Sequence, residues 1–441
     1  MVNNVDKIQE LRAYTNDMFC LLEQDEVTAK EYSNKINDYL TNLLEIEKCV
    51  SHDVYSDYKE FVDSFAAFCK SCENEVFLKE NIEIMGSTLS LLSEVLADLL
   101  SKYNDMINND IDEELCKNGP LVSVIMSTYN HEPYVAEAIE SIVNQTYKNI
   151  EFLVADDGSI DGTVDIMKKY SSHFDVEIYY NENSGGRFLE LYKHAKGKYV
   201  ALINSDDIWD INKLAIQIKY LEEHPKCGAC FTWCEYFDEN RNYINDKKFF
   251  CENRSRSQWL RLFWDKGNCL CHPSVVSRRE YYCDFISCGF AGRQIPDFFR
   301  WIDLVQKTDI YVCPKVLTFM RWYRNDVREN TSAGTRINLI RTGIESGIGW
   351  FWNIRNMQDD LFIESFRDLF INKDASTKDE IKIEKYFLLK NGKDVFTQNA
   401  ALFYFNEIYG DVYDTLEKEY GYYMKSYWED ETGIGIGPLI V

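Results

Sequence analysis

The stretch Leu121-Val-Ser-Val-Ile-Met126 opens the part of the chain that decides the fold. It is apolar, rich in β-branched residues and carries only one small hydroxyl, which is typical of a strand covered on both faces of a parallel sheet. Two similar runs follow, Ile150-Glu-Phe-Leu-Val-Ala155 and Tyr199-Val-Ala-Leu-Ile203. Because helical patterns alternate with strands between residues 120 and about 330, the sequence predicts an α/β domain.

Polar and acidic residues follow each of these three strands: Ser127-Thr-Tyr-Asn130, Asp156-Asp-Gly-Ser159 and Asn204-Ser-Asp-Asp207. In an open α/β sheet, ligands bind outside the carboxyl ends of the strands. We therefore expect these side chains to form a binding site rather than scattered surface charge.

Length and charge limit the classes of function. A chain of 441 residues is long enough for two to three domains. The net charge of −25 and the pI near 4.7 argue against nucleic acid or an anionic membrane as a partner held by bulk electrostatics. A local basic pocket stays compatible with this composition.

The cysteines and the apolar runs bear on location. Fourteen cysteines occur, and the amino terminus lacks the pattern of an export signal. We expect reduced thiols in a cytoplasmic protein; a peripheral position at the inner face of the membrane is left open. No run reaches the roughly 18 apolar residues of a membrane span. The C-x-x-C pairs Cys69/Cys72 and Cys227/Cys230 are interpreted as buried small hydrophobes rather than zinc ligands.

The chain divides into three predicted regions. Residues 1–118 contain a single glycine, Gly86, and no proline, and their apolar residues recur at helical spacing. We predict a helical bundle or a coiled-coil-like domain there, which could join copies into a homo-oligomer. Residues 119–335 form the α/β domain, and residues 336–441 form a helical carboxyl-terminal region, in which Thr377-x-x-Glu380 predicts a capping box.

Five motifs carry a resemblance to a known family: Val122-Ser-Val-Ile-Met-Ser-Thr-Tyr-Asn130, Ala138-Ile-Glu-Ser-Ile-Val-Asn-Gln-Thr-Tyr147, Asp156-Asp-Gly-Ser159, Ala195-Lys-Gly-Lys-Tyr-Val200 and Ser205-Asp-Asp207. In this order and spacing they resemble the family 2 glycosyltransferases, inverting enzymes of the GT-A fold. The chain is most similar to the soluble, non-processive members. The resemblance implies a mixed sheet that binds a nucleotide sugar, flanked by helices, with helical extensions at both ends.

The resemblance also implies roles for residues of the donor site. Tyr129 would stack on the nucleotide base, and Ser127 and Asp157 would hydrogen-bond its edge; Asn130 belongs to the same nucleotide-binding set. Asp206 would lie near the ribose and the metal, and Asp207 would bind Mn²⁺ or Mg²⁺, which prefer hard carboxylate oxygens. The alternative for these adjacent acids is a cap on the helix that follows.

Inversion requires a general base, and the resemblance points to Asp297 at the start of Pro296-Asp-Phe-Phe-Arg-Trp-Ile-Asp303. The family usually has a second acid where this chain has Pro296. The alternative is that Asp297 only caps its helix.

Other residues are weaker candidates for the same site. The resemblance aligns His272 with a histidine that could approach the diphosphate or the metal, but a lone histidine is as often structural. Arg187 and Arg324 could hold phosphate, or lie on the surface. Asn204 replaces an acid that the family's metal motif often has. Thr318 replaces the glutamine of the processive members' motif, which favours single transfer.

The predicted function is transfer of a sugar from a nucleotide sugar, most simply a UDP-sugar, to a glycan, lipid-linked sugar, small-molecule or protein acceptor, with Mn²⁺ or Mg²⁺ as cofactor and no nucleic acid as partner. The non-enzymatic alternative is a degenerate domain that serves as an assembly scaffold through its helical ends. A dehydrogenase is disfavoured because no G-x-G-x-x-G follows the first strand.

Overall fold

The computed structural model describes residues 111–180, 182, 190–238, 243–244, 248–284, 294–322 and 336–423, together with positions 64, 67, 91 and 94. Nearly all of the predicted domain 1–118 lies outside these residues, so its helices remain a prediction. The described residues also do not include Arg187, Arg324 or the pair Cys69/Cys72. The helix α7 (Glu113–Asn118) leads into the sheet, and its Cys116 is buried in the core that covers one sheet face.

Within the described residues, nine strands form one mixed sheet: β1 (Val122–Thr128), β2 (Ile150–Asp156), β3 (Val176–Tyr179), β4 (Tyr199–Asn204), β5 (Ile208–Trp209), β6 (Cys227–Phe237), β7 (Tyr243–Ile244), β8 (Val276–Arg278) and β9 (Asp309–Arg321). The order is β3-β2-β1-β4-β8-β6-β9-β5, with β7 beside β6. Strands β1 to β4 are parallel, whereas β8 runs antiparallel to β4 and β6. The prediction of a mixed sheet is confirmed.

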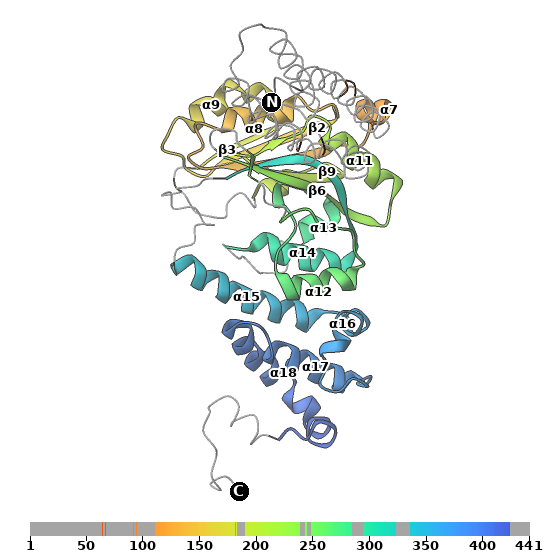
Figure 1. Ribbon diagram of the computed structural model, residues 1–441. Coiled ribbons are helices and arrows are strands. Elements are labelled where there is room, and N and C mark those ends of the chain that lie inside the picture. Colours follow the sequence, from red (N-terminus) through yellow and green to blue (C-terminus); the bar gives the residue numbers. More distant parts are fainter. Residues whose placement is uncertain are drawn as a thin grey trace, which may run out of the picture.

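Helices cover both faces of the sheet (Figure 1). One face carries α8 (Val135–Val143), α9 (Thr163–Lys169) and α11 (Lys213–Glu223), and the other carries α12 (Arg256–Lys266), α13 (Arg279–Asp284) and α14 (Pro296–Lys307). The side chains of β1 explain this arrangement, because Val124 and Met126 enter one core cluster and Ile125 enters the other. A strand that is apolar on both sides needs a cover on both sides.

Helical residues also continue past the sheet, as the sequence predicts: α15 (Arg336–Asn356), α16 (Asp359–Phe366), α17 (Lys378–Lys390) and α18 (Val395–Tyr420), with the short helices α10 (Leu191–His194), η1 (Ser171–His173), η3 (His272–Ser274) and η5 (Arg367–Leu369). The predicted capping box is present, because Thr377 accepts from the backbone of Glu380 while the Glu380 carboxylate accepts from the backbone of Thr377. Figure 1 shows α15 directly below the α12–α14 layer, with α17 and α18 beneath it.

The cysteines follow the prediction only in part. Cys227 and Cys230 are buried, as expected for small hydrophobes. Cys234 of β6 and Cys271 form a disulfide, with their Cα atoms 6.7 Å apart, so the prediction of reduced thiols is wrong for this pair. Their adjacency depends on β6 lying beside β8, which spacing in the sequence does not reveal. Among the described residues, no helix is long and apolar enough to cross a bilayer.

Candidate active site

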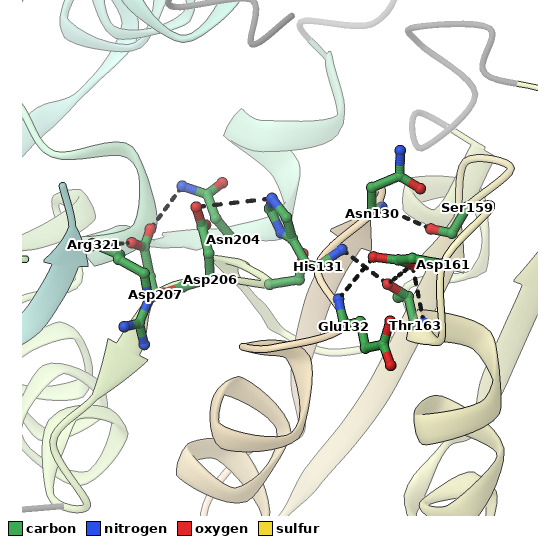
Figure 2. Close-up of polar contacts among 11 residues, drawn as sticks. Asn130, His131, Glu132, Ser159, Asp161, Thr163, Asn204, Asp206, Asp207 and Arg321 are labelled. Atoms are coloured by element: carbon green, nitrogen blue, oxygen red, sulfur yellow. Dashed lines mark hydrogen bonds and ion pairs between the residues drawn. The ribbon is translucent and has the colours of Figure 1, made fainter. Parts of the chain in front are cut away.

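The sheet register brings three loops to one edge. Ser127 of β1 pairs with Ala155 of β2 on one side and with Asn204 of β4 on the other. The residues that follow these three positions therefore emerge side by side at the carboxyl ends of the strands (Figure 2). The expected convergence of the polar and acidic residues is confirmed by this geometry.

The first loop is held to the second by Asn130. Its φ of 53° lies in the left-handed region, which asparagine tolerates better than most residues. The backbone N–H of Asn130 donates to Ser159 Oγ at 2.8 Å, and its Oδ1 accepts from the backbone of Ile160 at 2.9 Å. Tyr129, just before it, keeps 39% of its surface exposed at the edge. The turn therefore presents an exposed aromatic ring at the sheet edge.

The two acids at the carboxyl end of β2 differ in burial and in their hydrogen bonds. Asp156 is buried and accepts from the backbone N–H groups of Gly158 and Ser159 at 3.1 and 2.9 Å. Gly158 has a φ of 83°, and a Cβ there would lie 2.7 Å from the backbone of Glu182. Asp157 is half-buried, and its backbone N–H donates to Thr128 at 2.9 Å. Asp156 thus builds the turn that positions Asp157.

The two acids after β4 also differ from each other in burial. Asp207 is buried; its Oδ1 accepts from the backbone N–H of Arg321 at 3.0 Å and its Oδ2 from Asn204 Nδ2 at 2.8 Å. Burial, and then the neighbouring carboxylate of Asp206, raise the pKa of Asp207 well above its usual range. Asn204, which replaces an acid of the family motif, is therefore a donor that supports Asp207.

Two residues of this site had no assigned role from the sequence. His131 places Nδ1 2.7 Å from Ser205 Oγ and Nε2 3.9 Å from Asp206 Oδ2 (Figure 2). Its position directly after Asn130 was the only signal in the sequence.

Arg321 is the second residue without a predicted role. It donates through Nε to the carbonyl of Asp206 at 3.2 Å and pairs with Glu137 at 2.9 Å. Its guanidinium lies 4.3 Å from the Tyr134 ring centroid and 4.5 Å from that of Phe237. Arg321 thus fastens the end of β9 to the loop that carries the acid pair.

The acid pair fits a divalent cation. Two adjacent carboxylates, one of them buried, repel each other, and a cation between them would relieve both the repulsion and the cost of burial. In the described part of the chain, no cluster of three or more His, Cys, Asp or Glu side chains could hold a metal ion. Mg²⁺ and related ions typically bind to one or two carboxylates and take further ligands from phosphate and water.

Asp297 lies in the first turn of α14, directly after Pro296. The residue at the N-cap position is Ile295, whose side chain has no polar atom to cap the helix. The Asp297 carboxylate accepts from Asn268 Nδ2 at 3.0 Å. Burial raises its pKa above the ordinary value, although the first-turn backbone N–H groups and Asn268 oppose that shift. A carboxylate with a raised pKa is a stronger base than an exposed one.

His272 is half-buried and lies against Trp301, with 6.1 Å between the ring centroids. Burial, together with the positive charge of Arg300, lowers the pKa of His272 to about 3, so the imidazole is neutral. Trp209, two residues after Asp207, donates through Nε1 to the carbonyl of Pro273 at 2.7 Å. This bond ties the His272 segment to the loop of the acid pair.

Residues 123–283 match the family model for glycosyl transferase family 2. WfgD of Escherichia coli, named a UDP-Glc:alpha-D-GlcNAc-diphosphoundecaprenol beta-1,3-glucosyltransferase, is 38% identical over 204 residues, which are 44% of this chain and 76% of WfgD. The chain belongs to glycosyl transferase family 2.

Further relatives match shorter spans. WfaP of Escherichia coli, which carries the same enzymatic name, is 37% identical over 122 residues, 27% of this chain and 47% of WfaP. An uncharacterized glycosyltransferase of Methanocaldococcus jannaschii is 34% identical over 168 residues, 36% of this chain and 57% of that protein. The first curated relatives are matched over about half of their length, from 46% to 57%.

Among solved structures, TarS of S. aureus (residues 1–349, in complex with UDP-GlcNAc) aligns with a TM-score of 0.43 and 18% identity over 61% of this chain and 80% of TarS.

The family match covers the sheet edge described above. The predicted site residues that fall within residues 123–283 are Ser127, Tyr129, Asn130, Asp157, Asp206, Asp207 and His272. Asp297 and Arg321 follow that span. Arg321 contacts the acid pair through Asp207 and the carbonyl of Asp206. Asp297 is joined to the matched span by its hydrogen bond from Asn268.

Proposed function

We propose that this chain transfers a sugar from a UDP-sugar to a hydroxyl of a lipid-linked sugar diphosphate, with inversion at the anomeric carbon. One observation carries the proposal: an exposed aromatic ring, a half-buried acid and a pair of adjacent acids share the carboxyl edge of β1, β2 and β4. This is the edge at which α/β sheets bind nucleotides.

The donor is held by two kinds of contact. Tyr129 offers its exposed face for stacking on the base, which favours any planar heterocycle. Asp157 accepts a hydrogen bond from an N–H on the edge of the base, as the imide of uracil provides, and Ser127 adds a hydroxyl. Asn130 contributes by fixing the turn that carries Tyr129.

The diphosphate is neutralised at the acid pair. Asp207 and Asp206 would hold Mn²⁺ or Mg²⁺, which supplies positive charge to the diphosphate as it leaves. His272, being neutral, is suited to donate or accept a hydrogen bond near this group rather than to add charge. Arg187, which lies outside the described residues, is retained as a phosphate-binding candidate.

The base is Asp297. Its carboxylate takes the proton of the acceptor hydroxyl as the new glycosidic bond forms, while the bond between the anomeric carbon and the nucleoside diphosphate breaks. Asn268 orients the carboxylate through its hydrogen bond and keeps part of the population ionised.

The acceptor class comes from the relatives. WfgD and WfaP are named as enzymes that act on alpha-D-GlcNAc-diphosphoundecaprenol. Because this chain is 37% and 38% identical to WfaP and WfgD over the matched residues, we extend the lipid-diphosphate class of acceptor to it. The presence of Tyr129, Asp157, Asp207 and Asp297 speaks against the scaffold alternative, which needs none of them.

Calorimetry with a panel of nucleotide sugars, with and without Mn²⁺, tests the donor and the metal. We expect a UDP-sugar to bind and Mn²⁺ to tighten binding; in Asp207→Asn this tightening is lost. The matched control is Asp210→Asn, since Asp210 is also a buried acid but accepts from the backbone of Asn212 at 2.9 Å.

The donor proposal fails if no nucleotide sugar binds. The metal assignment fails if Asp207→Asn keeps the Mn²⁺ dependence of the unmodified protein. Transfer to a soluble glycan or a protein, with none to a lipid-linked diphosphate sugar, would replace the acceptor class alone.

A further inference from the structure

Helix α15 has three faces, and two of them are packed. Gly343 and Gly347 face Phe396 of α18, and a Cβ at Gly347 would lie 2.5 Å from the Phe396 carbonyl oxygen. Gly349 faces Phe299 of α14, whose ring a Cβ would approach to 2.3 Å. Glycines thus let α15 lie close to both neighbours, while the side chains of the third face are exposed among the residues that the structure describes.

That third face is apolar. Five of its residues recur at intervals of three or four and are between 36% and 63% exposed: Ile337, Ile340, Ile344, Ile348 and Trp352. They extend along about 22 Å of helix at 1.5 Å per residue. Single exposed isoleucines are ordinary, but a continuous stripe at helical spacing marks an interaction surface. We call these five residues the α15 stripe.

Aromatic rings widen the stripe toward α18. Phe403 is 70% exposed, and its ring centroid lies 6.5 Å from that of Phe351 on α15. The apolar surface therefore spans two helices rather than one ridge.

The charges of α15 are basic, in contrast to the net charge of −25 for the whole chain. The helix contains Arg336, Arg341 and Arg355 against one acid, Glu345. Arg355 is bonded to Glu407 at 2.5 Å, whereas Arg336 and Arg341 are exposed and form no ion pair with a residue that the structure describes. A local positive charge thus accompanies the stripe.

Glu345 also attaches α15, which carries the α15 stripe, to the segment just before α14. Its Oε2 accepts from the backbone N–H groups of Gln294 and Ile295 at 2.8 and 3.1 Å. These residues immediately precede Pro296 and Asp297. The amino-terminal half of α15 is therefore attached to the segment that carries the proposed base.

We propose that the α15 stripe docks on the surface of a bilayer that contains anionic phospholipids. The isoleucines and Trp352 would enter the boundary between headgroups and acyl chains, and Arg336 and Arg341 would meet lipid phosphates, as in interfacial amphipathic helices. Docking there would bring the Asp297 segment toward headgroups at the membrane surface. This inference rests on the proposed function in one respect: a lipid-linked acceptor would explain why docking at a membrane is useful to the enzyme.

A second copy of the chain fits the same surface less well. Two α15 stripes packed on each other would bring Arg336 and Arg341 of both copies to the interface, and the single acid of the helix is turned toward α14. Unpaired like charges at an interface are unfavourable. An anionic lipid surface supplies the countercharge instead.

Vesicle flotation of the full-length protein tests the docking. Vesicles of phosphatidylglycerol and phosphatidylcholine should bind the protein more tightly than vesicles of phosphatidylcholine alone. Ile344→Glu/Ile348→Glu should weaken binding about tenfold or more, because two inserted apolar side chains become charged. Arg341→Gln should weaken binding only to the anionic vesicles, by about fivefold.

The matched control is Leu369→Glu/Ile371→Glu, which adds the same charge at residues that are 37% and 54% exposed but lie between α16 and α17. It should bind vesicles like the unmodified protein. Thermal unfolding of each variant excludes misfolding as the cause of any loss.

The proposal is overturned if the unmodified protein does not float with anionic vesicles, or if both double variants lose binding equally. It is also overturned if Ile344→Glu/Ile348→Glu lowers the oligomeric mass in solution, because the stripe would then join copies of the chain. Flotation needs neither donor nor acceptor, so it is independent of the proposed function. Vesicle binding without UDP-sugar binding would remove the proposed function and leave the docking.

Discussion

Asn268 is one of the groups that act on the pKa of the carboxylate at the start of α14. Its amide donates to Asp297 at 3.0 Å and so lowers a pKa that burial raises. In Asn268→Ala the pKa of Asp297 should rise further, and a smaller fraction of the base is ionised at a given pH. The acid limb of the pH profile of kcat/KM for transfer should therefore move to higher pH, with UDP-sugar affinity unchanged.

Asn356→Ala is a suitable control, because its amide donates to the carbonyl of Trp352 within α15. A shift of the acid limb in both variants, or in neither, would show that Asn268 does not act on the titrating group.

The sequence was informative about single residues where the local motif determines the role. The second strand and the turn after it put Asp156 and Asp157 at one edge, as expected, and Asp156 is buried. The role that the family resemblance gives to Asp157 stays a prediction. The burial of Asp207 was not foreseen, since the residue was expected at an open strand end. Its partner Arg321 is 114 positions away, a contact that no local pattern predicts.

At the scale of elements, the close approach of α15 and α18 can be tested at a glycine. Gly347→Ala would place a Cβ 2.5 Å from the backbone of Phe396, so we expect the free energy of unfolding to fall by about 1 to 3 kcal/mol. Gly410→Ala in α18 is the control, because a Cβ there meets no atom of the described residues within 4 Å. That variant should gain about 0.5 to 1 kcal/mol, since glycine is unfavourable inside a helix.

Chemical denaturation measures both changes. Equal effects of the two alanines would mean that α15 and α18 are not held together by this contact.

Elements with local signals were predicted well. The apolar runs of β1, β2 and β4 and the capping box of α17 need only neighbours in sequence. The insertion of β8 antiparallel between β4 and β6 depends on pairing between distant segments. The disulfide between Cys234 and Cys271 is a consequence of that pairing, which is why cysteine spacing did not reveal it.

At the scale of the molecule, the sheet edge, α14 and α15 form a connected series. The acid pair contacts the end of β9, Trp209 reaches the His272 segment, Asn268 reaches Asp297, and Glu345 joins α15 to α14. From the overall negative charge, the sequence predicted that bulk electrostatics would hold neither an anionic membrane nor a nucleic acid. The basic residues of α15 are a local exception to that overall charge. The helical domain at residues 1–118 stays a prediction.

The central claim is that Asp297 is the base of a glycosyl transfer, and Asp297→Asn tests it most directly. Asparagine keeps the size of the side chain and can accept from Asn268, but it cannot take up the acceptor proton. Transfer from a UDP-sugar at saturating Mn²⁺ should fall by about 10²-fold or more, with the Kd for the donor unchanged. Asp303→Asn, which removes an acid of the same helix that forms an ion pair with Lys307, should transfer at the normal rate. Transfer by Asp297→Asn close to that of the unmodified protein would contradict the account.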